Sequence, residues 1–536
     1  MSLRTTYNEV EKIWSGPKRT LLFNPESSVG QVLFMCLSHQ SPEKVIQINV
    51  GENTRWTCEE VLSKSVKVAY NLQRLDLKQT DILGVIATNT SNLMPLCYGM
   101  FFIGVPFHAI DCDHSKESAV RRWAITRPKI IFCDGNKLDF VMEIIGELNL
   151  SCEVYTLNEH RSGVKQFDEL LQELPNDKVF YPPEITSSLQ TAAISNSSGS
   201  TGFAKAVTLS HRIISETLST LYETASDTHI CLFSLFWECG ILDYLLPAVT
   251  GCTNITSNIW FTGDDIVMLV DKYKVTGLTL MPMFVAQMLS SPLIEKLSLK
   301  SLTSIFSMGA KLPIEMRRRI EKYLSKSCKI MDNYGNSERS SIMMEVSEGK
   351  SIPFFNVEIK IIDEKGQNLS CNQNGEICVR KDSIWSGYFG NKEATDEVYD
   401  LNENWYKTED MGYFDENGYF HFVERIKDII RLDIVDISPV ELEEIILQMD
   451  NVAQVCVFGI PHELKSSIVG ALVIKKSESK ITEKDIEKFV AEKAPDYMHL
   501  EGGAYLVDSL PLTSTGKIIR KDATAIGIKK YRDRFD

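Results

Sequence analysis

The sequence lacks the marks of several broad protein classes. Its 536 residues carry 57 Lys and Arg against 72 Asp and Glu, which leaves a net charge of −15 with His neutral. A dedicated nucleic-acid-binding protein usually shows a basic excess, so this balance argues against a nucleic-acid partner. The 13 cysteines form no CxxC pair and no Cys/His ligand spacing. They are too sparse for a disulfide scaffold, and we interpret them as reduced thiols in a cytosol-like compartment.

Long hydrophobic runs and targeting signals are also missing. Residues 1–16 contain no apolar core of signal-peptide length. The most apolar stretch, residues 96–110, is too short to span a bilayer and includes Gly99, Gly104 and Pro106, so it predicts a buried helix and a turn. The C-terminal residues, RFD, are no SKL-type peroxisomal address. We therefore expect a cytoplasmic protein without a transmembrane segment.

The apolar pattern that is present predicts an α/β fold. The chain is 43% hydrophobic and 24% charged, as in soluble globular proteins, which excludes disorder and coiled coil as its main character. From residue 30 to about 310, strand-length apolar runs alternate with helical periodicity, which is typical of α/β layers around a largely parallel sheet. Strands are expected at 130–133, 192–194, 304–307 and 328–331, and helices at 211–225, with Ser210 as N-cap, and at 312–326.

The pattern changes twice in the second half of the chain. From about residue 353 apolar and polar residues alternate, which indicates antiparallel strands, as in a small β-barrel. From about residue 426 helix caps at Ser438 and Thr482 alternate with short strands. We predict a large N-terminal domain, residues 1–425, of layered α/β subdomains plus the barrel, and a small mobile α+β C-terminal domain, residues 426–536.

One loop has the composition of a phosphate-binding loop. Residues 197–205, SSGSTGFAK, supply hydroxyls, glycines and a Lys between a strand and a helix. Hydroxyls, backbone N–H groups and an ammonium suit polyphosphate oxygens. The loop is not a Walker A motif, because Ala206 follows Lys205 where that motif has Ser or Thr. Taken alone, the same residues also fit a flexible surface linker.

Three further segments carry candidate groups. Residues 332–338 offer Tyr334 for stacking on a base and Glu338 for Mg²⁺, or they form a β-turn with a solvated carboxylate. Asp410 with Arg425 can grip a ribose diol, or both belong to a charged surface turn. Residues 513–517 present Lys517 near the C-terminus, where a lone Lys is usually a solvated charge.

Together and in this order, these segments resemble the adenylate-forming superfamily. The likeness is strongest to its branch of beetle luciferases, coumarate–CoA ligases and fatty acyl-CoA synthetases, and it runs from about residue 50 to the end. The matching segments are SSGSTGFAK (197–205), SMGAKL (307–312), NYGNSE (333–338), NGEICVR (374–380), SGYFGN (386–391), KTEDMGYFDENGYF (407–420), ERIKDII (424–430) and LTSTGKIIRK (512–521).

The resemblance implies a two-step ligase that uses ATP, Mg²⁺ and CoA. A carboxylate would attack the α-phosphate of ATP, and the CoA thiol would then displace AMP from the acyl-adenylate. It implies an AMP-binding domain over residues 1–425 and a lid domain over 426–536. By the same resemblance, the β- and γ-phosphates would be held by Ser198, Gly199, Ser200, Thr201, Gly202 and Lys205.

The remaining roles follow from the resemblance in the same way. Lys517 would neutralise charge developing on the α-phosphate, and Lys427 would be the hinge of the lid. Ser337 would contact the α-phosphate and Glu338 would bind Mg²⁺. The adenosine would be bound by Gly309, Ala310, Tyr334, Gly335, Asp410 and Arg425.

Four segments depart from the family pattern. Ala204 and Ala206 flank Lys205 where relatives usually have Pro and Gly, and Glu409 replaces the Gly before the ribose-binding Asp, where we expect it to repel Asp410. Trp237 stands at the position of a catalytic His of luciferases, as an acyl-pocket gate or as plain core packing. Ile434 replaces a Gly on the thiol path beside Asp433, which is unfavourable for the approach of CoA.

Two classes of function follow. The leading hypothesis is an AMP-forming carboxylate–CoA ligase acting on a fatty or aromatic acid. The alternative is a luciferase-like paralogue that binds nucleotide or acyl ligand with little or no turnover, as a sensor or scaffold. Oxygenation of an adenylate, as in luciferases, is disfavoured by Trp237.

Overall fold

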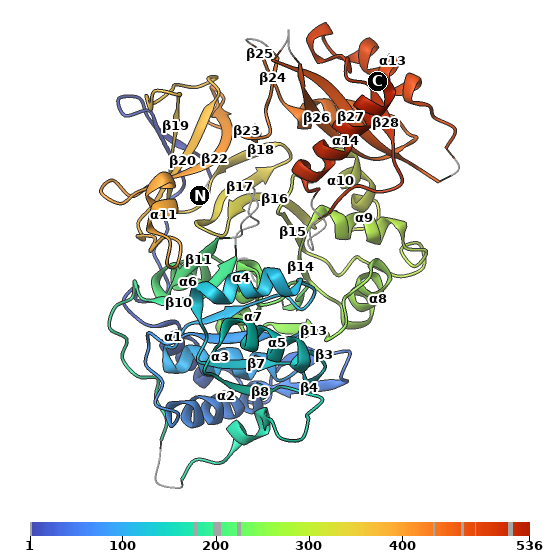
Figure 1. The fold of residues 1–536 in the computed structure, drawn as a ribbon. Helices are drawn as coiled ribbons and strands as arrows, with labels where there is room; N and C mark the ends of the chain where they lie inside the picture. The colour runs from blue at the N-terminus through green and yellow to red at the C-terminus, as the bar shows by residue number, and fades with distance from the viewer. Residues whose placement is uncertain are drawn as a thin grey trace. The chain divides into compact units, whose positions relative to one another are not determined.

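The computed structural model describes residues 3–175, 179–196, 205–221, 227–432, 435–462, 466–477, 479–512 and 518–535 (Figure 1). The chain forms two compact units. The larger comprises Met1–Arg4, Ser15–Glu358 and Arg380–Tyr406, and the smaller comprises Thr5–Trp14, Ile359–Val379 and Lys407–Asp536. Helices and sheets occur in both, which confirms the α/β fold with a large N-terminal and a small C-terminal part. The boundary at residue 425 stays a prediction.

The larger unit contains a seven-stranded sheet whose strands are all parallel except β11, which pairs antiparallel with β10. In spatial order the strands are β11 (Ala206–Ser210), β10 (Thr191–Asn196), β6 (Phe107–Ala109), β5 (Leu83–Ile86), β7 (Ile130–Cys133), β8 (Glu153–Thr156) and β9 (Lys165–Gln166).

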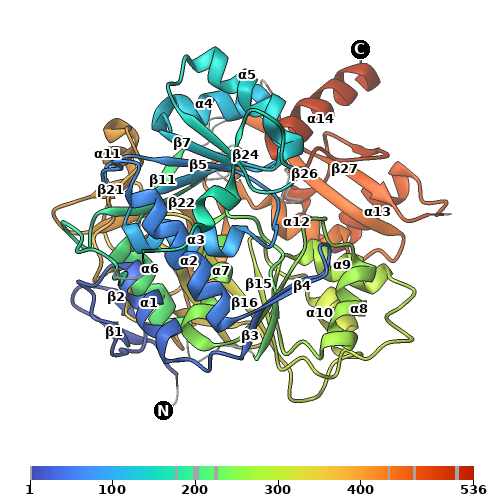
Figure 2. The ribbon, with the colours of Figure 1, turned by 90° about the horizontal axis from the view of Figure 1, so that it is seen from below.

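Helices cover this sheet on both faces, which explains why its strands are apolar throughout. Along β7, Ile130 and Phe132 belong to one core and Ile131 and Cys133 to another. The second core is completed by α4 (Lys116–Thr126) and α5 (Leu138–Leu148), which lie together beside β5 and β7 in Figure 2. The first core is completed by α1 (Val29–His39), α2 (Cys58–Gln73), α3 (Leu93–Ile103) and α7 (Glu238–Thr250).

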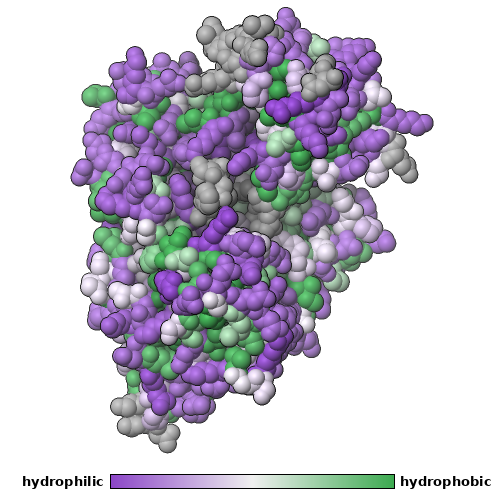
Figure 3. All heavy atoms as spheres, in the orientation of Figure 1, coloured by the Kyte–Doolittle hydropathy of each residue, from purple (hydrophilic) through white to green (hydrophobic). Residues whose placement is uncertain are grey.

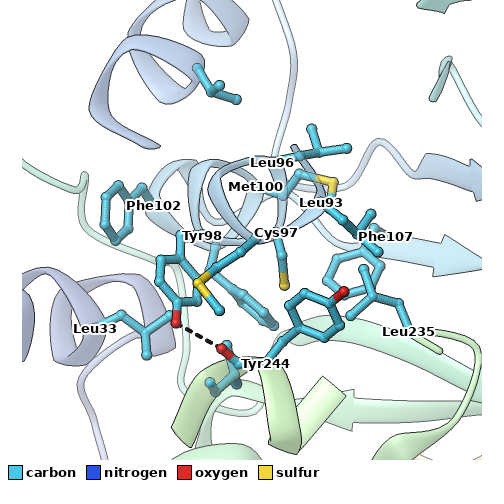
Figure 4. Packing of buried hydrophobic residues seen from close by; sticks show 14 of the residues in the cluster. Leu33, Leu93, Leu96, Cys97, Tyr98, Met100, Phe102, Phe107, Leu235 and Tyr244 are labelled. Carbon is cyan, nitrogen blue, oxygen red and sulfur yellow. Dashed lines mark hydrogen bonds between the residues drawn. The ribbon is translucent and has the colours of Figure 1, made fainter. Parts of the chain in front are cut away.

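Helix α3 lies in the middle of the first core and confirms the prediction of a buried helix and turn. Gly104 ends it with φ +68°, the left-handed conformation that suits glycine. Tyr98 is fully buried, and its hydroxyl donates to the carbonyl oxygen of Tyr244 on α7 at 2.7 Å (Figure 4). The hydrogen bond satisfies a phenol that would otherwise be costly to bury.

A second sheet of the larger unit is parallel in its centre and antiparallel at both ends. Its strands run in the order β18 (Lys350–Pro353), β17 (Ser340–Ser347), β16 (Lys329–Asn336), β15 (Ser304–Met308), β14 (Gly277–Leu280), β12 (Thr228–Ile230), β13 (Thr253–Thr256), β3 (Val45–Asn49) and β4 (Thr54–Thr57). Three helices pack on it in a third core, namely α8 (Gly263–Tyr273), α9 (Pro282–Ser290) and α10 (Ile314–Glu321). Helices α6 (His211–Leu221) and α11 (Lys392–Val398) also belong to this unit.

The strands expected at 130–133, 192–194 and 304–307 are confirmed, but three details of the prediction are wrong. The helix that follows the phosphate loop does start at His211, with the Ser210 hydroxyl accepting from the backbone N–H of Ile213. Before it, however, residues 206–210 form β11 antiparallel to β10, because their buried side chains complete the sheet edge. Helix α10 is shorter than predicted. Strand β16 continues through residue 336, since β17 pairs with it.

The smaller unit has an antiparallel part and an α+β part. The strands run in the order β1 (Thr6–Asn8), β2 (Ile13–Ser15), β19 (Val357–Ile362), β20 (Gly375–Lys381), β22 (Trp405–Phe414) and β23 (Phe420–Arg425), of which β22 and β23 pair antiparallel. The short strand β21 (Tyr399–Asp400) belongs to the larger unit and pairs antiparallel with the first two residues of β22. The α+β part contains β24 (Ile430–Leu432), β25 (Val435–Ile437), α12 (Pro439–Ile446), β26 (Val452–His462), β27 (Ser466–Lys475), α13 (Glu483–Lys493), β28 (Ala504–Leu506) and α14 (Arg520–Phe535). The caps predicted at Ser438 and Thr482 are both present.

On the face drawn in Figure 3, hydrophilic residues predominate and hydrophobic residues form separate patches. Among the described residues, no helix has the length and apolar character that crossing a membrane requires.

A buried ion pair fixes α10 to the strand that carries Tyr334. Arg317 donates through Nη1 to both carboxylate oxygens of Glu345 at 2.8 Å and through Nη2 to the carbonyl oxygen of Ile330 at 2.7 Å. Glu345 also accepts from the backbone N–H of Asp332 at 3.0 Å. Removing one partner leaves an uncompensated buried charge, which is usually far more costly than the net worth of the pair.

We therefore expect Arg317→Ala to destabilise the larger unit by about 3–5 kcal/mol. The measurement is urea unfolding followed by tryptophan fluorescence, with the wild-type protein as reference. Arg318→Ala is the matched control, because the Arg318 side chain is 63% exposed. An equal midpoint for both variants would contradict the importance of the buried pair.

Candidate functional site

Two of the predicted residues meet at Tyr388. The Tyr388 hydroxyl donates to Oε1 of Glu338 at 2.9 Å, and Lys205 Nζ lies 4.6 Å from the centre of the Tyr388 ring. Glu338 is only 7% exposed. A Lys ammonium over an aromatic face gains cation–π attraction. The structure thus brings Lys205 and Glu338, which are distant in sequence, to one phenol.

Strand β11 explains why Tyr388 lies there. Residues 387–389 run beside this strand, with a bridge between Val207 and Tyr388, and the Phe389 N–H donates to the Ala206 carbonyl oxygen at 2.8 Å. The Thr208 hydroxyl donates to the Gly387 carbonyl oxygen at 2.6 Å. The sequence analysis did not select Tyr388 as a site residue. Its position in the segment SGYFGN, which resembles a family motif, was the feature that could have identified it.

Ser337 and Tyr334 lie close to the same place. The Ser337 hydroxyl donates to the carbonyl oxygen of Asn196, the last residue of β10, at 3.4 Å. Tyr334 and Glu338 both interact electrostatically with the phenol of Tyr406, whose pKa burial raises. Gly335 is needed beside them, because a Cβ there would come within 2.3 Å of the carbonyl oxygen of Ser340.

Asn196 is held by side chains that the sequence did not reveal. Its Oδ1 accepts from His108 Nε2 and from Arg122 Nε, each at 3.1 Å, and its Nδ2 donates to the Ala109 carbonyl oxygen at 3.2 Å. Burial lowers the pKa of His108 to about 4, so the ring is neutral at pH 7. Since an amide oxygen only accepts, Nε2 carries the proton, and Nδ1 accepts from the hydroxyl of Thr126 at 2.9 Å. This network fixes the end of β10 before residue 197.

The predicted adenosine-binding turn follows β15. Gly309 has φ +82°, a conformation that favours glycine, and Ala310 is exposed. The Leu312 N–H donates to Oδ2 of Asp332 at 3.1 Å and ties the turn to β16. Trp237 immediately precedes α7, half-buried and edge-on to Phe236 with 4.6 Å between ring centres. Its role as an acyl-pocket gate stays a prediction.

In the smaller unit, Asp410 and Arg425 face each other across β22 and β23. Arg425 Nε lies 3.3 Å from Oδ1 of Asp410, which is 5% exposed. Glu409 has φ +60° and its carboxylate lies 2.6 Å from Lys427 Nζ. The Glu409 carboxylate therefore forms an ion pair with Lys427, the predicted hinge residue, and the sequence did not suggest this contact.

Several predicted residues lie outside the described residues. They are Ser198, Gly199, Ser200, Thr201 and Gly202 of the phosphate loop, Lys517, and Asp433 with Ile434. Within the described ranges, no group of three or more His, Cys, Asp or Glu side chains is arranged to hold a metal ion.

Asp332, at the start of the predicted nucleotide segment, has a perturbed carboxyl group. Burial and the nearby charge of Glu345 raise its pKa to about 6, against hydrogen bonds from Leu312 and Ser307 and the charge of Arg317. The folded state then retains a proton that the unfolded state loses. Stability contributed by this group is present below the unfolded pKa and is lost as pH rises through the folded value.

We expect Asp332→Asn to stabilise the protein progressively between about pH 4 and pH 6. The gain should reach on the order of 2–3 kcal/mol above pH 7, because the amide removes a buried charge and keeps an acceptor for Leu312. Urea unfolding of both proteins at several pH values measures it. A pH-independent difference would contradict the raised pKa.

Comparison with known proteins places these residues in a family. The model of the AMP-binding enzyme family matches residues 37–389, and that of the AMP-binding enzyme C-terminal domain matches residues 441–517. A probable 4-coumarate–CoA ligase 1 of Dictyostelium discoideum is 28% identical over 528 residues, covering 93% of this chain and 95% of its own. A luciferin 4-monooxygenase of Photinus pyralis is 27% identical over 509 residues, covering 90% of each chain.

Solved structures show the same fold. ATP-bound MatB from Rhodopseudomonas palustris superposes with a TM-score of 0.83 at 21% identity, over 94% of this chain and 100% of that one. The anthranilate CoA ligase AuaEII in complex with anthranoyl-AMP gives a TM-score of 0.85 at 18% identity, over 95% and 99% of the two chains. With the family model matched over most of the N-terminal part and its companion at the C-terminal end, the chain belongs to the AMP-binding enzyme family of the adenylate-forming superfamily.

Proposed function

We propose that the protein is an AMP-forming acid–thiol ligase that couples a carboxylic acid to CoA through an acyl-adenylate. The observation that carries this proposal is the meeting of Lys205 and Glu338 at Tyr388, with Ser337 bonded to the end of β10. The Lys205 ammonium, the Glu338 carboxylate and the Ser337 hydroxyl therefore lie near Asn196, the last described residue before the phosphate loop. Adenylation depends mainly on positioning and on stabilising phosphate charge, and these groups supply both.

Mg²⁺ fits the donor set of this site. Mg²⁺ keeps several waters and binds proteins through one or two carboxylates together with substrate phosphates. A single buried carboxylate, Glu338, meets that need without a cluster of acidic ligands. The ion would neutralise phosphate charge there, while Tyr388 would orient the carboxylate.

The other assignments complete the proposal. Lys205 and residues 198–202 bind the β- and γ-phosphates, Tyr334 and Gly309 with Ala310 and Gly335 bind the adenine, and Asp410 with Arg425 binds the ribose. Lys517 stabilises the charge that develops on the α-phosphate, an interaction stronger in the transition state than in the ground state. Lys427 is the hinge that moves the lid between the two steps.

An aromatic acid is the better supported substrate, and CoA the acceptor. Relatives that match over nearly the whole chain carry the name 4-coumarate–CoA ligase, and the anthranilate CoA ligase shares the fold. The departures at Glu409 and Ile434 favour a second candidate function, a protein that binds nucleotide or acyl ligand with little or no turnover.

ATP–pyrophosphate exchange with a panel of carboxylic acids, with and without CoA, tests the proposal. We expect exchange that depends on one class of acid, and AMP and thioester on addition of CoA. Lys517→Ala should reduce exchange about 100-fold or more while ATP affinity changes little, because removing one charge-stabilising group acts on the transition state. No exchange with any acid, despite ATP binding, would establish the second candidate.

We also expect Tyr388→Phe to reduce exchange about 10- to 100-fold and to raise the Mg²⁺ concentration required for half-maximal rate. The variant keeps the ring under Lys205 but removes the hydrogen bond that orients Glu338. Tyr181→Phe is the matched control, because Tyr181 is 71% exposed. An unchanged Mg²⁺ dependence would show that Glu338 does not serve as the metal ligand.

A further inference from the structure

A series of hydrogen-bonded side chains leads to the Glu338 carboxylate within the larger unit. The Tyr388 hydroxyl donates to Oε1 of Glu338 at 2.9 Å, and the hydroxyls of Tyr388 and Tyr406 are hydrogen-bonded to each other. The Tyr406 hydroxyl accepts a further hydrogen bond from Nδ2 of Asn336 at 3.4 Å. We call these three side chains, Asn336, Tyr406 and Tyr388, the donor series.

The direction of each hydrogen bond follows from the number of protons that the groups carry. A phenol has one proton to donate, and an ionised carboxylate only accepts. Because the Tyr388 hydroxyl donates to Glu338, the bond between the two phenols requires Tyr406 as its donor. The Tyr406 oxygen then accepts from Asn336. Every donor of the series therefore points toward Glu338.

The backbone fixes the orientation of the first donor. The Arg339 N–H donates to Oδ1 of Asn336 at 2.9 Å. Since a backbone N–H only donates, the amide oxygen of Asn336 faces Arg339 and its nitrogen faces Tyr406. Asn336 ends β16, two residues before Glu338. The series thus begins and ends in the same turn of the chain.

A buried tryptophan orients both phenol rings. Trp385 is 1% exposed, and the rings of Tyr388 and Tyr406 lie edge-on to it, with 4.9 Å and 5.5 Å between ring centres. Its Nε1 donates to the carbonyl oxygen of Thr208 on β11 at 3.2 Å. Edge-to-face contacts of this kind favour one arrangement of the rings. They limit the freedom of the two hydroxyls to turn away from each other.

We propose that Tyr406 is a positioning residue for the metal ligand Glu338, acting through Tyr388, with Asn336 as the first donor. This inference rests on the proposed ligase function, in which Glu338 binds Mg²⁺, and it adds the side chains that orient that ligand. Hydrogen bonds in series polarise one another, so donation by Tyr406 strengthens donation by Tyr388. Groups that fix the orientation of a metal ligand contribute to metal affinity.

Tyr406→Phe tests the proposal, because it removes the hydroxyl and keeps the ring against Trp385. In ATP–pyrophosphate exchange, we expect the Mg²⁺ concentration for half-maximal rate to rise about 3- to 10-fold, since one neutral hydrogen bond is lost. Tyr399→Phe is the matched control. The Tyr399 ring is also edge-on to Trp385, at 5.6 Å, but its hydroxyl donates to Asn404 at 2.6 Å. An unchanged Mg²⁺ requirement in Tyr406→Phe, or an equal rise in Tyr399→Phe, would overturn the inference.

A double variant separates a positioning role from a merely structural one. If Tyr406 acts through Tyr388, combining Tyr388→Phe with Tyr406→Phe should raise the Mg²⁺ requirement no further than Tyr388→Phe alone, within about twofold. Effects that multiply in the double variant would overturn the inference. If Tyr406→Phe does not fold, Asn336→Ala removes the first donor and should raise the Mg²⁺ requirement in the same direction. An unchanged requirement in Asn336→Ala would then overturn the inference.

Binding without turnover separates failure of this inference from failure of the ligase function. The rise in melting temperature caused by α,β-methylene-ATP, which cannot be cleaved between its α- and β-phosphates, is measured against Mg²⁺ concentration. A higher Mg²⁺ requirement in Tyr406→Phe, with Tyr399→Phe unchanged, supports the inference even when no acid gives exchange. An equal requirement in all three proteins, with exchange intact in the wild type, contradicts the inference alone. No exchange and no Mg²⁺-dependent rise would contradict both proposals.

Discussion

The buried hydrogen bond between Tyr388 and Glu338 is the contact on which the candidate site depends. A carboxylate that is almost removed from water needs donors, because an unsatisfied buried charge is costly. The phenol meets that need and at the same time offers its ring to Lys205. Three segments far apart in sequence are thereby held together: the end of the phosphate loop, the turn after β16, and the segment that runs beside β11. The network around Asn196 fixes the other end of the loop in the same way.

Much of the fold follows from local sequence. The apolar run at residues 130–133 predicts a buried strand, and β7 is one because helices cover both of its faces. The caps at Ser438 and Thr482 begin helices for reasons that lie within four residues. Strand β11 was missed because residues 206–210 become a strand only by pairing with β10, and the extension of β16 depends in the same way on β17. Pairing of that kind is a tertiary property.

The candidate site likewise has residues that the sequence predicts and residues that only the folded structure reveals. Motifs identified Lys205, Ser337 and Glu338, and they predicted the pairing of Asp410 with Arg425, whose side chains do face each other. Tyr388 and Asn196 with its partners could not be predicted, because they are defined by which side chains meet in the folded chain. The same reason explains Glu409, which the sequence indicates as a neighbour repelling Asp410 and which the structure pairs with Lys427.

That pairing has a consequence for the timing of the reaction. Lys427 is the residue that we predict to rotate when the lid moves, and its ammonium is held by a carboxylate only 2.6 Å away. Both side chains are more than a third exposed, so the contact is worth roughly 0–1 kcal/mol and is screened by salt. If this ion pair must break before the lid rotates, it slows the rotation by no more than about fivefold. Glu409 would thus slow the rotation of the lid slightly, and more so at low ionic strength. In relatives with glycine at that position, this ion pair would not oppose the rotation.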